Sequence, residues 1–331
     1  MSARKSLALG FGLMALANIL GGATYPVQKL ALDGLPPATV TLLRNLFALV
    51  PLALLTMRPA AKRKFAQRMH TAGRSDGTSA GRGMGFLGLR FFEGGDLGRM
   101  LVLGILAYGA PLLLGIVGTK YSTASNASIL LLVEPPMILF FSWLLLKERI
   151  RPRVMVGICV GLIGAAWIVL DSAAPGDLFA GELMMGNLLL AFHGALWGLH
   201  TPISKPLAMR VDPFVLTTWV VLSSMLILIP GAAYELMSFE FVGPIGPALW
   251  WTVALGLVGT VLSLGFWFFA LERIPASSVA PFLFLQPLVG VLIGVLWLDE
   301  PMTGAIMIGG TILVVGVLFT LGGQRTRGST P

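Results

Sequence analysis

Residues 124–148 read ASNASILLLVEPPMILFFSWLLLKE, and residues 276–300 read ASSVAPFLFLQPLVGVLIGVLWLDE. The two stretches align without a gap at an offset of 152 residues, and the alignment extends over residues 101–170 and 253–322. An earlier block, residues 15–42, recurs at an offset of 176. The second half of the chain therefore repeats the first half, which carries 24 extra residues between its two blocks.

The composition places this duplicated unit in a membrane. Of 331 residues, 56% are hydrophobic and only 11% are charged, far below the roughly one quarter that is usual in soluble domains. A bilayer-spanning helix needs about 20 mostly apolar residues. Ten segments meet this requirement, five in each half: residues 7–27, 37–57, 101–118, 124–146, 154–170, 183–203, 214–234, 248–271, 277–298 and 302–322. The sequence predicts an all-α integral membrane protein with ten transmembrane helices.

The number of spans and the loop charges set the predicted topology. Five spans per half place the second half upside down relative to the first, so the repeats are inverted. Twenty of the 23 lysines and arginines fall on one side of the membrane, and basic loops are retained in the cytoplasm. Both termini are therefore expected in the cytoplasm of a cell, with the chain in the inner or plasma membrane. The predicted units are residues 7–170 and residues 183–322, followed by a cytoplasmic tail, residues 323–331.

The extra residues of the first half lie mostly in a basic, glycine-rich loop, residues 58–99, which we expect on the cytoplasmic side. Within it, residues 83–88 read GMGFLG and formally fit G-x-G-x-x-G. A dinucleotide site would need a surrounding βαβ unit, which does not fit there. The net charge of +8 is loop charge that anionic lipid attracts, and no nucleic acid or cofactor is expected.

A family resemblance follows from the two quoted stretches. Each begins with small residues and has a proline within the helix and a glutamate thirteen residues later, at Pro135 and Glu148 and at Pro287 and Glu300. This pattern resembles the EamA-type repeat of the drug/metabolite transporter superfamily. The resemblance implies a secondary transporter of a small organic metabolite that works by alternating access. It favours export of amino acids, related metabolites or drugs, with import of a vitamin or sugar-phosphate-like solute as the alternative.

Two other classes of protein are the alternatives to a transporter. An integral membrane enzyme would need a nucleophile, a metal cluster or paired carboxylates, and a receptor or structural protein would not require broken helices and a buried charge. We therefore expect no catalytic residue and no metal site. The expected partners are a small-molecule solute, protons and membrane lipid, and the chain is expected to function as a monomer.

Glu134 is the sharpest candidate for contact with a solute, because an ionisable group within hydrocarbon is costly. It lies about ten residues into its span, roughly 15 Å deep. Pro135 and Pro136 follow it and are expected to interrupt the helix, as is Pro287 in the second half. Glu134 either binds a cationic group or exchanges a proton, or it makes a structural ion pair or hydrogen bond. The aligned residue of the second half, its repeat mate, is Gln286, another candidate.

Arg44 lies about seven residues into the second span, at a depth similar to that of Glu134. Its long side chain can pair with Glu134, extend to the outer surface, or contact an anionic substrate. We favour structural pairing or extension to the surface.

His193, Trp197 and His200 stand at i, i+4 and i+7 and share one helical face. They are expected to line a cavity, with hydrogen bonding between helices as the alternative. Two histidines about 10 Å apart are poorly placed to share a metal ion. The equivalent face of the first span is small, with Asn18 and Tyr25 beside it, which leaves room for a solute.

Small and acidic residues at helix contacts complete the predictions. Glycines in spans five and ten are expected to let two helices approach closely: Gly157, Gly161, Gly164, Gly309, Gly310 and Gly316. Glu148 and Glu300 are expected to anchor the starts of the same two spans. Positions at which the halves differ, such as Glu134 against Gln286, are where we expect the solute.

Overall fold

The computed structural model describes residues 3–57, 96–122, 130–172, 181–237, 239, 245–297 and 302–322. Within these ranges all ten predicted spans appear as helical segments, and the described residues form no strands. Those of the first half are α1 (Ala3–Leu32), α2 (Pro37–Thr56), α4 (Asp96–Gly104) with η2 (Ile105–Gly109) and α5 (Ala110–Lys120), η3 (Leu131–Val133) with α7 (Glu134–Leu146), and α8 (Pro152–Ser172).

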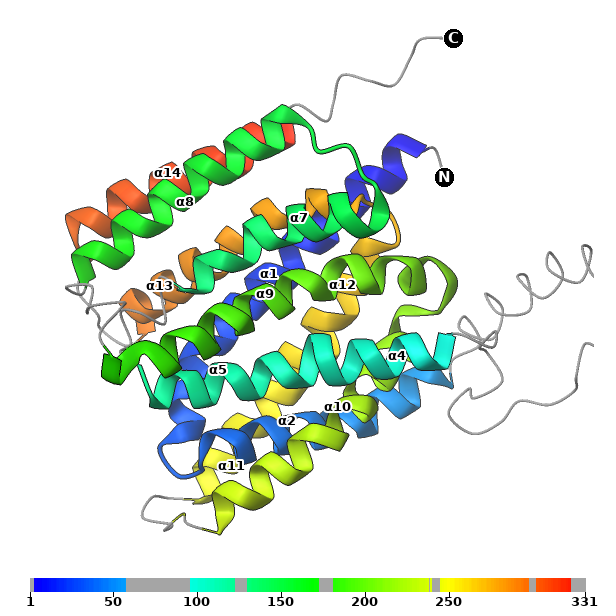
Figure 1. Cartoon of the computed structure of the whole chain (residues 1–331), viewed down its shortest axis with the longest axis vertical. Helices are drawn as coiled ribbons and strands as arrows, with labels where there is room; N and C mark the ends of the chain where they lie inside the picture. The colour runs from blue at the N-terminus through cyan, green and yellow to red at the C-terminus, as the bar shows by residue number, and fades with distance from the viewer. Residues whose placement is uncertain are drawn as a thin grey trace, which may run out of the picture.

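The second half repeats this order. Its segments are α9 (Gly181–Arg210), α10 (Pro213–Leu236), α11 (Ile245–Ala254) with η4 (Leu255–Ser263) and α12 (Leu264–Leu271), η5 (Ala276–Ser278) and η6 (Ala280–Phe284) with α13 (Leu285–Trp297), and α14 (Gly304–Gly322). The helices lie side by side as one bundle, with the beginning of α1 and the end of α14 at the same end (Figure 1).

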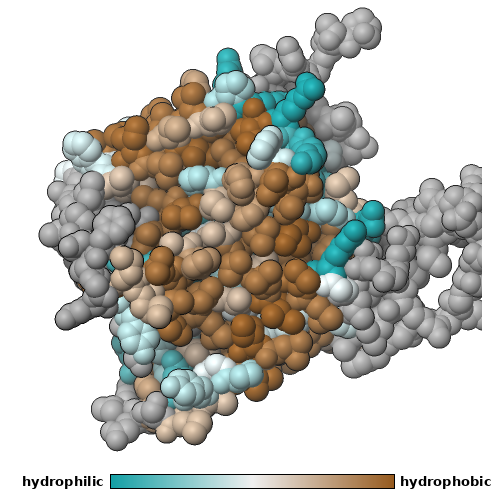
Figure 2. Space-filling view, in the orientation of Figure 1, coloured by the Kyte–Doolittle hydropathy of each residue, from teal (hydrophilic) through white to brown (hydrophobic). Residues whose placement is uncertain are grey.

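The surface fits a membrane. By length and composition, six of the described helices can cross a bilayer, and three shorter apolar helices accompany them. The remaining long helix, α9, carries polar residues in its middle. Figure 2 shows hydrophobic side chains over the middle of one face and hydrophilic ones gathered toward its edges. This band is the surface expected to face lipid.

The glycines of α8 and α14 demonstrate the inversion of the two halves. A Cβ added at Gly157 would lie 2.8 Å from the carbonyl oxygen of Gly316, and one at Gly164 would lie 2.7 Å from that of Gly309. Because Gly157 aligns with Gly309 and Gly164 with Gly316, equivalent helices cross in antiparallel directions. The predicted close approach through small residues is confirmed.

Contacts between the other helices follow the same pseudo-two-fold symmetry. In the first half α1 packs against α13 and α12, and its counterpart α9 packs against α7 and α5. The two remaining counterparts, α2 and α10, pack against each other. Both begin with proline at the first helical position, where a missing N–H is harmless. The interface between the halves therefore consists of matched helix pairs.

The structure corrects several predicted boundaries. The first and sixth spans were expected over residues 7–27 and 183–203, but α1 and α9 continue past their apolar runs through Lys29 and Lys205. The third span begins at Asp96, so the predicted loop overlaps the first turn of α4, and its residues 58–95 lie outside the described residues. The predicted tail, residues 323–331, lies outside them too.

The helix type changes about one turn before each of the prolines that were expected to interrupt the helices. A short 3₁₀ turn precedes α7, which starts at Glu134, so that Pro135 and Pro136 occupy its first turn. Pro287 lies in the first turn of α13, after the 3₁₀ segment η6. Proline is tolerated there because the first N–H groups of a helix have no partner within it. The change of helix type comes just before these prolines.

Two π-helical segments were not predicted. They are η2 in the third span and η4 in the eighth, and residues 105–109 align with residues 257–261. π-helical turns inside α-helices occur frequently at functional sites. Their equivalent positions in the two halves draw attention to the side chains they carry.

Candidate functional site

A cavity of about 920 Å³ lies between the two halves. Such a volume falls within the range of small-molecule sites, roughly 300–1,000 Å³. Six of the predicted site residues line it: Arg44, Glu134, His193, Trp197, His200 and Gln286. Asn18 is fully buried behind Gln286, and the side chain of Tyr25 lies outside the described residues.

The cavity opens at the end of the bundle opposite the beginning of α1. There it is lined by Tyr121 after α5 and Tyr234 near the end of α10, whose side chains are 52% and 79% exposed. At this mouth the Glu235 carboxylate accepts hydrogen bonds from Thr39 N at 3.0 Å and Thr39 Oγ1 at 3.4 Å, which ties α10 to the first turn of α2. At the inner end the cavity stops at Trp267 and Leu283, both at most 8% exposed.

Glu134 and Gln286 occupy equivalent positions but have different surroundings. The Gln286 Nε2 donates a hydrogen bond to Asn18 Oδ1 at 2.8 Å. The repeat mate of Asn18 is Gly194, which lies against the start of α7, so Glu134 meets no amide there. Among the described residues the Glu134 carboxylate has neither a hydrogen-bond nor an ion-pair partner. The structural ion pair or hydrogen bond that was considered for Glu134 is therefore not found among the described residues.

Arg44 is held on the cavity wall by a polar network. Its Nε donates to Thr260 Oγ1 at 3.4 Å, and the Thr260 hydroxyl donates to Asn45 Oδ1 at 3.2 Å. The hydroxyl of Tyr108 donates to the same Asn45 oxygen at 3.2 Å. Tyr108 and Thr260 are repeat mates, one in each π-helical segment. Among the described residues Arg44 pairs with no carboxylate, so pairing with Glu134, one of the two favoured alternatives, is not found there.

Aromatic rings form the inner wall. Trp197 packs edge-on against Tyr108 with ring centroids 5.7 Å apart, and His200 lies 5.5 Å from Trp197 and 5.7 Å from Phe268. His193 Nδ1 lies 2.6 Å from the carbonyl oxygen of Pro111. A carbonyl can only accept, so Nδ1 carries the proton, and His193 bonds another helix while it lines the cavity.

Comparison with known proteins decides the family. The sequence profile of the EamA-like transporter family matches residues 8–170 and 184–322. The chain belongs to the EamA-like transporter family. A relative from Archaeoglobus fulgidus, described as an uncharacterized transporter, is 29% identical over 62% of this chain and 70% of its own length. A probable terminal-alkyne amino-acid exporter from Streptantibioticus cattleyicolor is 23% identical over 96% of each chain.

A solved crystal structure shares the fold of this EamA-like transporter. It is 20% identical, with a TM-score of 0.72, and the match covers 99% of this chain and 100% of the other. The chain is thus a multi-pass membrane protein with the ten-helix EamA fold.

The inverted symmetry of this EamA-like transporter holds at single contacts beside the cavity. Ser263 Oγ donates to the carbonyl oxygen of Ala17 at 2.8 Å. The repeat mates of these two residues are Pro111 and His193, which form the contact between α5 and α9. The same junction is therefore bridged in both halves, but only the second half supplies an imidazole ring to the cavity.

Sequence reasoning missed four residues at this site: Asn45, Tyr108, Thr260 and Trp267. The signal was present, because Tyr108 differs from its mate Thr260 and Trp267 differs from its mate Gly115. A glycine is required at 115, since a Cβ there would lie 2.6 Å from His193 Nδ1. Trp267 therefore lines the cavity in one half, and at the equivalent place in the other half His193 occupies the space beside Gly115.

Proposed function

We propose that this EamA-like protein is a secondary active transporter that exports a small zwitterionic metabolite of the amino-acid type. One observation carries the proposal: Arg44 and Glu134, of opposite charge and without ionic partners among the described residues, line the same cavity. An unpaired buried charge is costly unless a ligand neutralises it. A zwitterion supplies both missing charges, with its carboxylate toward Arg44 and its ammonium group toward Glu134.

The aromatic wall supports a side chain of moderate size. Trp197, Tyr108 and His200 form an apolar surface beside the two charged residues, and such rings bind apolar groups or stack on planar ones. The name of the Streptantibioticus relative, a probable terminal-alkyne amino-acid exporter, agrees with this substrate class. A sugar phosphate fits less well, because Glu134 would repel the phosphate.

We further propose that the chain lies in the cell membrane with both termini in the cytoplasm, so that the cavity of this structure opens to the outside. The distribution of basic residues supports this orientation. Transport proceeds by alternating access around the cavity, and Glu134 couples it to protons by binding either the solute ammonium group or a proton. One chain contains the whole cavity, which supports function as a monomer.

Flux measurements test this proposal. The purified protein in proteoliposomes is expected to exchange labelled amino acids across the membrane, faster when a pH gradient is imposed. Empty liposomes and liposomes with an unrelated membrane protein are the controls. Exchange of no zwitterion in a panel of small, aromatic and branched amino acids, by protein that remains monodisperse, would reject the proposed substrate class.

A further inference from the structure

The inner end of the cavity is closed by two successive layers. The first is apolar: Phe268 and Phe282 are 0% and 1% exposed, and Phe282 stacks on Phe11 of α1 with ring centroids 5.9 Å apart. Beyond it, toward the end of the bundle where α1 begins, lie residues 271–277, which comprise the last residue of α12, the connection to η5 and the first two residues of η5. A solute can leave by this end only if the segment moves.

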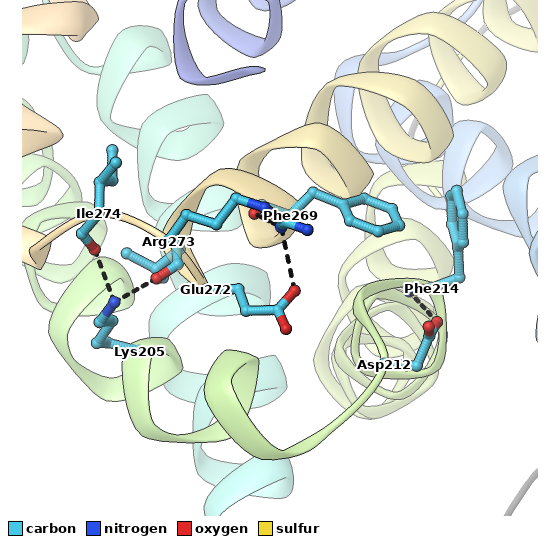
Figure 3. Close-up of polar contacts among 8 residues, drawn as sticks. Lys205, Asp212, Phe214, Phe269, Glu272, Arg273 and Ile274 are labelled. Carbon is cyan, nitrogen blue, oxygen red and sulfur yellow. Dashed lines mark hydrogen bonds and ion pairs between the residues drawn. The ribbon is translucent and has the colours of Figure 1, made fainter. Parts of the chain in front are cut away.

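Lys205 holds this segment from one side. Its Nζ donates to the carbonyl oxygens of Leu271 and Ile274 at 2.5 and 2.6 Å (Figure 3). Leu271 is the last residue of α12, where the helix dipole favours a cation, and Ile274 lies three residues beyond it. Lys205 belongs to α9, so its ammonium group ties the sixth span to the end of the eighth.

Glu148 holds the same segment from the other half of the protein. Its carboxylate accepts from Ala276 N and Ser277 N, both at 2.9 Å, and from Ser277 Oγ at 2.6 Å. Hydrogen bonds to an ionised group are roughly twice as strong as neutral ones. Glu148 was expected to anchor the start of span five, but it anchors the start of span nine, because the chain turns toward η5 after α7.

The backbone before Glu148 is adapted to this contact. Lys147 has φ of 54°, and it is the one described residue other than glycine with a positive φ. The left-handed conformation lets Glu148 N bond the carbonyl oxygen of Ser142 at 3.2 Å and turns the chain sharply after α7. Such a conformation is unfavourable for lysine and persists where surrounding contacts enforce it.

We propose that Glu148 and Lys205 form an inner latch on residues 271–277, which keeps the cavity closed at this end and must release before the solute can pass. The proposal rests on the transport function, since it assigns the step that opens the second side. Two side chains make the five hydrogen bonds of the latch: the three of Glu148 join the two halves, and the two of Lys205 join α9 to the same segment within the second half. Both are charged, so release exposes groups that water solvates well, and the latch can form and break during a cycle.

The sequence contains the same groups in both halves. The repeat mates of Lys205, Glu148 and Ser277 are Lys29, Glu300 and Ser125, identical in each case. The side chains of all three mates lie outside the described part of the chain. Identity at these positions, in halves that differ at Glu134 and Arg44, indicates that the latch serves the motion and not the choice of solute.

Accessibility from the closed side tests the latch. In a background with Cys159→Ser, a reporter Leu283→Cys at the inner end of the cavity is labelled with a membrane-impermeant maleimide applied from the side of the termini. Glu148→Gln and Ser277→Ala are expected to raise the labelling rate, by about tenfold for Glu148→Gln, because loss of a charge-assisted hydrogen bond shifts a two-state equilibrium by about that factor. The matched control is Asp212→Asn. Asp212 is a carboxylate at the same end of the bundle that caps α10 by accepting from Phe214 N at 3.0 Å, and it forms no hydrogen bond or ion pair with residues 271–277 (Figure 3).

Cross-linking keeps the test decisive if a variant folds poorly. Glu148→Cys with Ser277→Cys, joined by a short bis-methanethiosulfonate reagent, is expected to stop flux and to leave solute binding from the open side intact, with flux restored by a reductant. Unchanged labelling in Glu148→Gln, or full flux in the cross-linked protein, would overturn the latch. If the wild type without cross-linker bound no zwitterionic solute, that result would instead count against the proposed function.

Discussion

Gln286 donates a 2.8 Å hydrogen bond to the side-chain oxygen of Asn18, and the equivalent pair in the other half is Glu134 and Gly194. The same helix crossing is thus satisfied in one half and left open in the other. At the crossing of Gln286 and Asn18, the two side-chain amides bond each other. At the equivalent crossing of Glu134 and Gly194, a carboxylate faces the cavity with no amide beside it, and a ligand can bind there.

Replacing Glu134 with glutamine tests whether this carboxylate belongs to the protein's structure or to its function. Because the carboxylate has no partner among the described residues, Glu134→Gln removes an unpaired charge and is expected to leave the melting temperature unchanged or raise it. The dependence of flux on a pH gradient is expected to be lost, while exchange of solutes continues with a reduced preference for zwitterions. A lower melting temperature measured in detergent would instead indicate a structural partner.

Arg44→Gln is expected to weaken binding of solutes with a carboxylate by at least about tenfold, the effect of losing a charge-assisted contact worth about 1.5–3 kcal/mol. Binding of the corresponding amine, which lacks the carboxylate, should change little. Equilibrium binding of both compounds to purified wild-type and variant protein measures the difference. Equal weakening for the two compounds would show that Arg44 does not contact the carboxylate.

Thr260→Val removes the hydroxyl group that joins Arg44 to Asn45 without changing the size of the side chain. The guanidinium group is then less well positioned, and KM for the solute is expected to rise several-fold while kcat changes less. Thr252→Val is the matched control, because among the described residues its buried hydroxyl bonds only the Ala248 carbonyl oxygen of its own helix, at 2.7 Å. Indistinguishable KM values for the two variants would remove Thr260 from the site.

The glycine contact between α8 and α14 makes a prediction about stability. Gly157→Ala places a methyl group 2.8 Å from the Gly316 carbonyl oxygen and still closer to the Thr320 hydroxyl, so we expect a loss of about 1–3 kcal/mol through overpacking. Gly304→Ala should be nearly neutral, since a Cβ there meets nothing within 4 Å. Thermal unfolding in detergent compares the two, and equal melting temperatures would show that the helices can separate without loss.

Much of the fold could be predicted from the sequence. Long apolar runs, a gapless repeat and asymmetric loop charges are properties of the chain itself, and they indicated ten helices in two inverted units. The π-helical segments η2 and η4 could not be read in this way, because their hydrogen bonding depends on neighbouring helices. The 3₁₀ turn before Glu134, by contrast, covers the residues whose carbonyl groups lose their helical partners at Pro135 and Pro136.

The candidate site was only partly foreseen. Glu134, His193, Trp197 and His200 were recognisable as polar or bulky residues at positions where the halves differ. The partner of Arg44 was not, since its neighbour Thr260 is 216 residues away and small hydroxyls are common in helices. Glu148 was misassigned because sequence neighbours suggested span five, whereas the left-handed turn at Lys147 directs it to span nine.

Counterflow in proteoliposomes with three matched solutes tests the central claim most directly. The solutes are an amino acid, its decarboxylated amine and its N-acetyl derivative, compared in wild type, Arg44→Gln and Glu134→Gln. We predict that wild type exchanges the zwitterion far better than either analogue, that Arg44→Gln loses discrimination against the amine, and that Glu134→Gln loses discrimination against the N-acetyl derivative. Equal exchange of all three solutes by wild type, or variants that keep its preference, would contradict the assignment of these two charges to the solute.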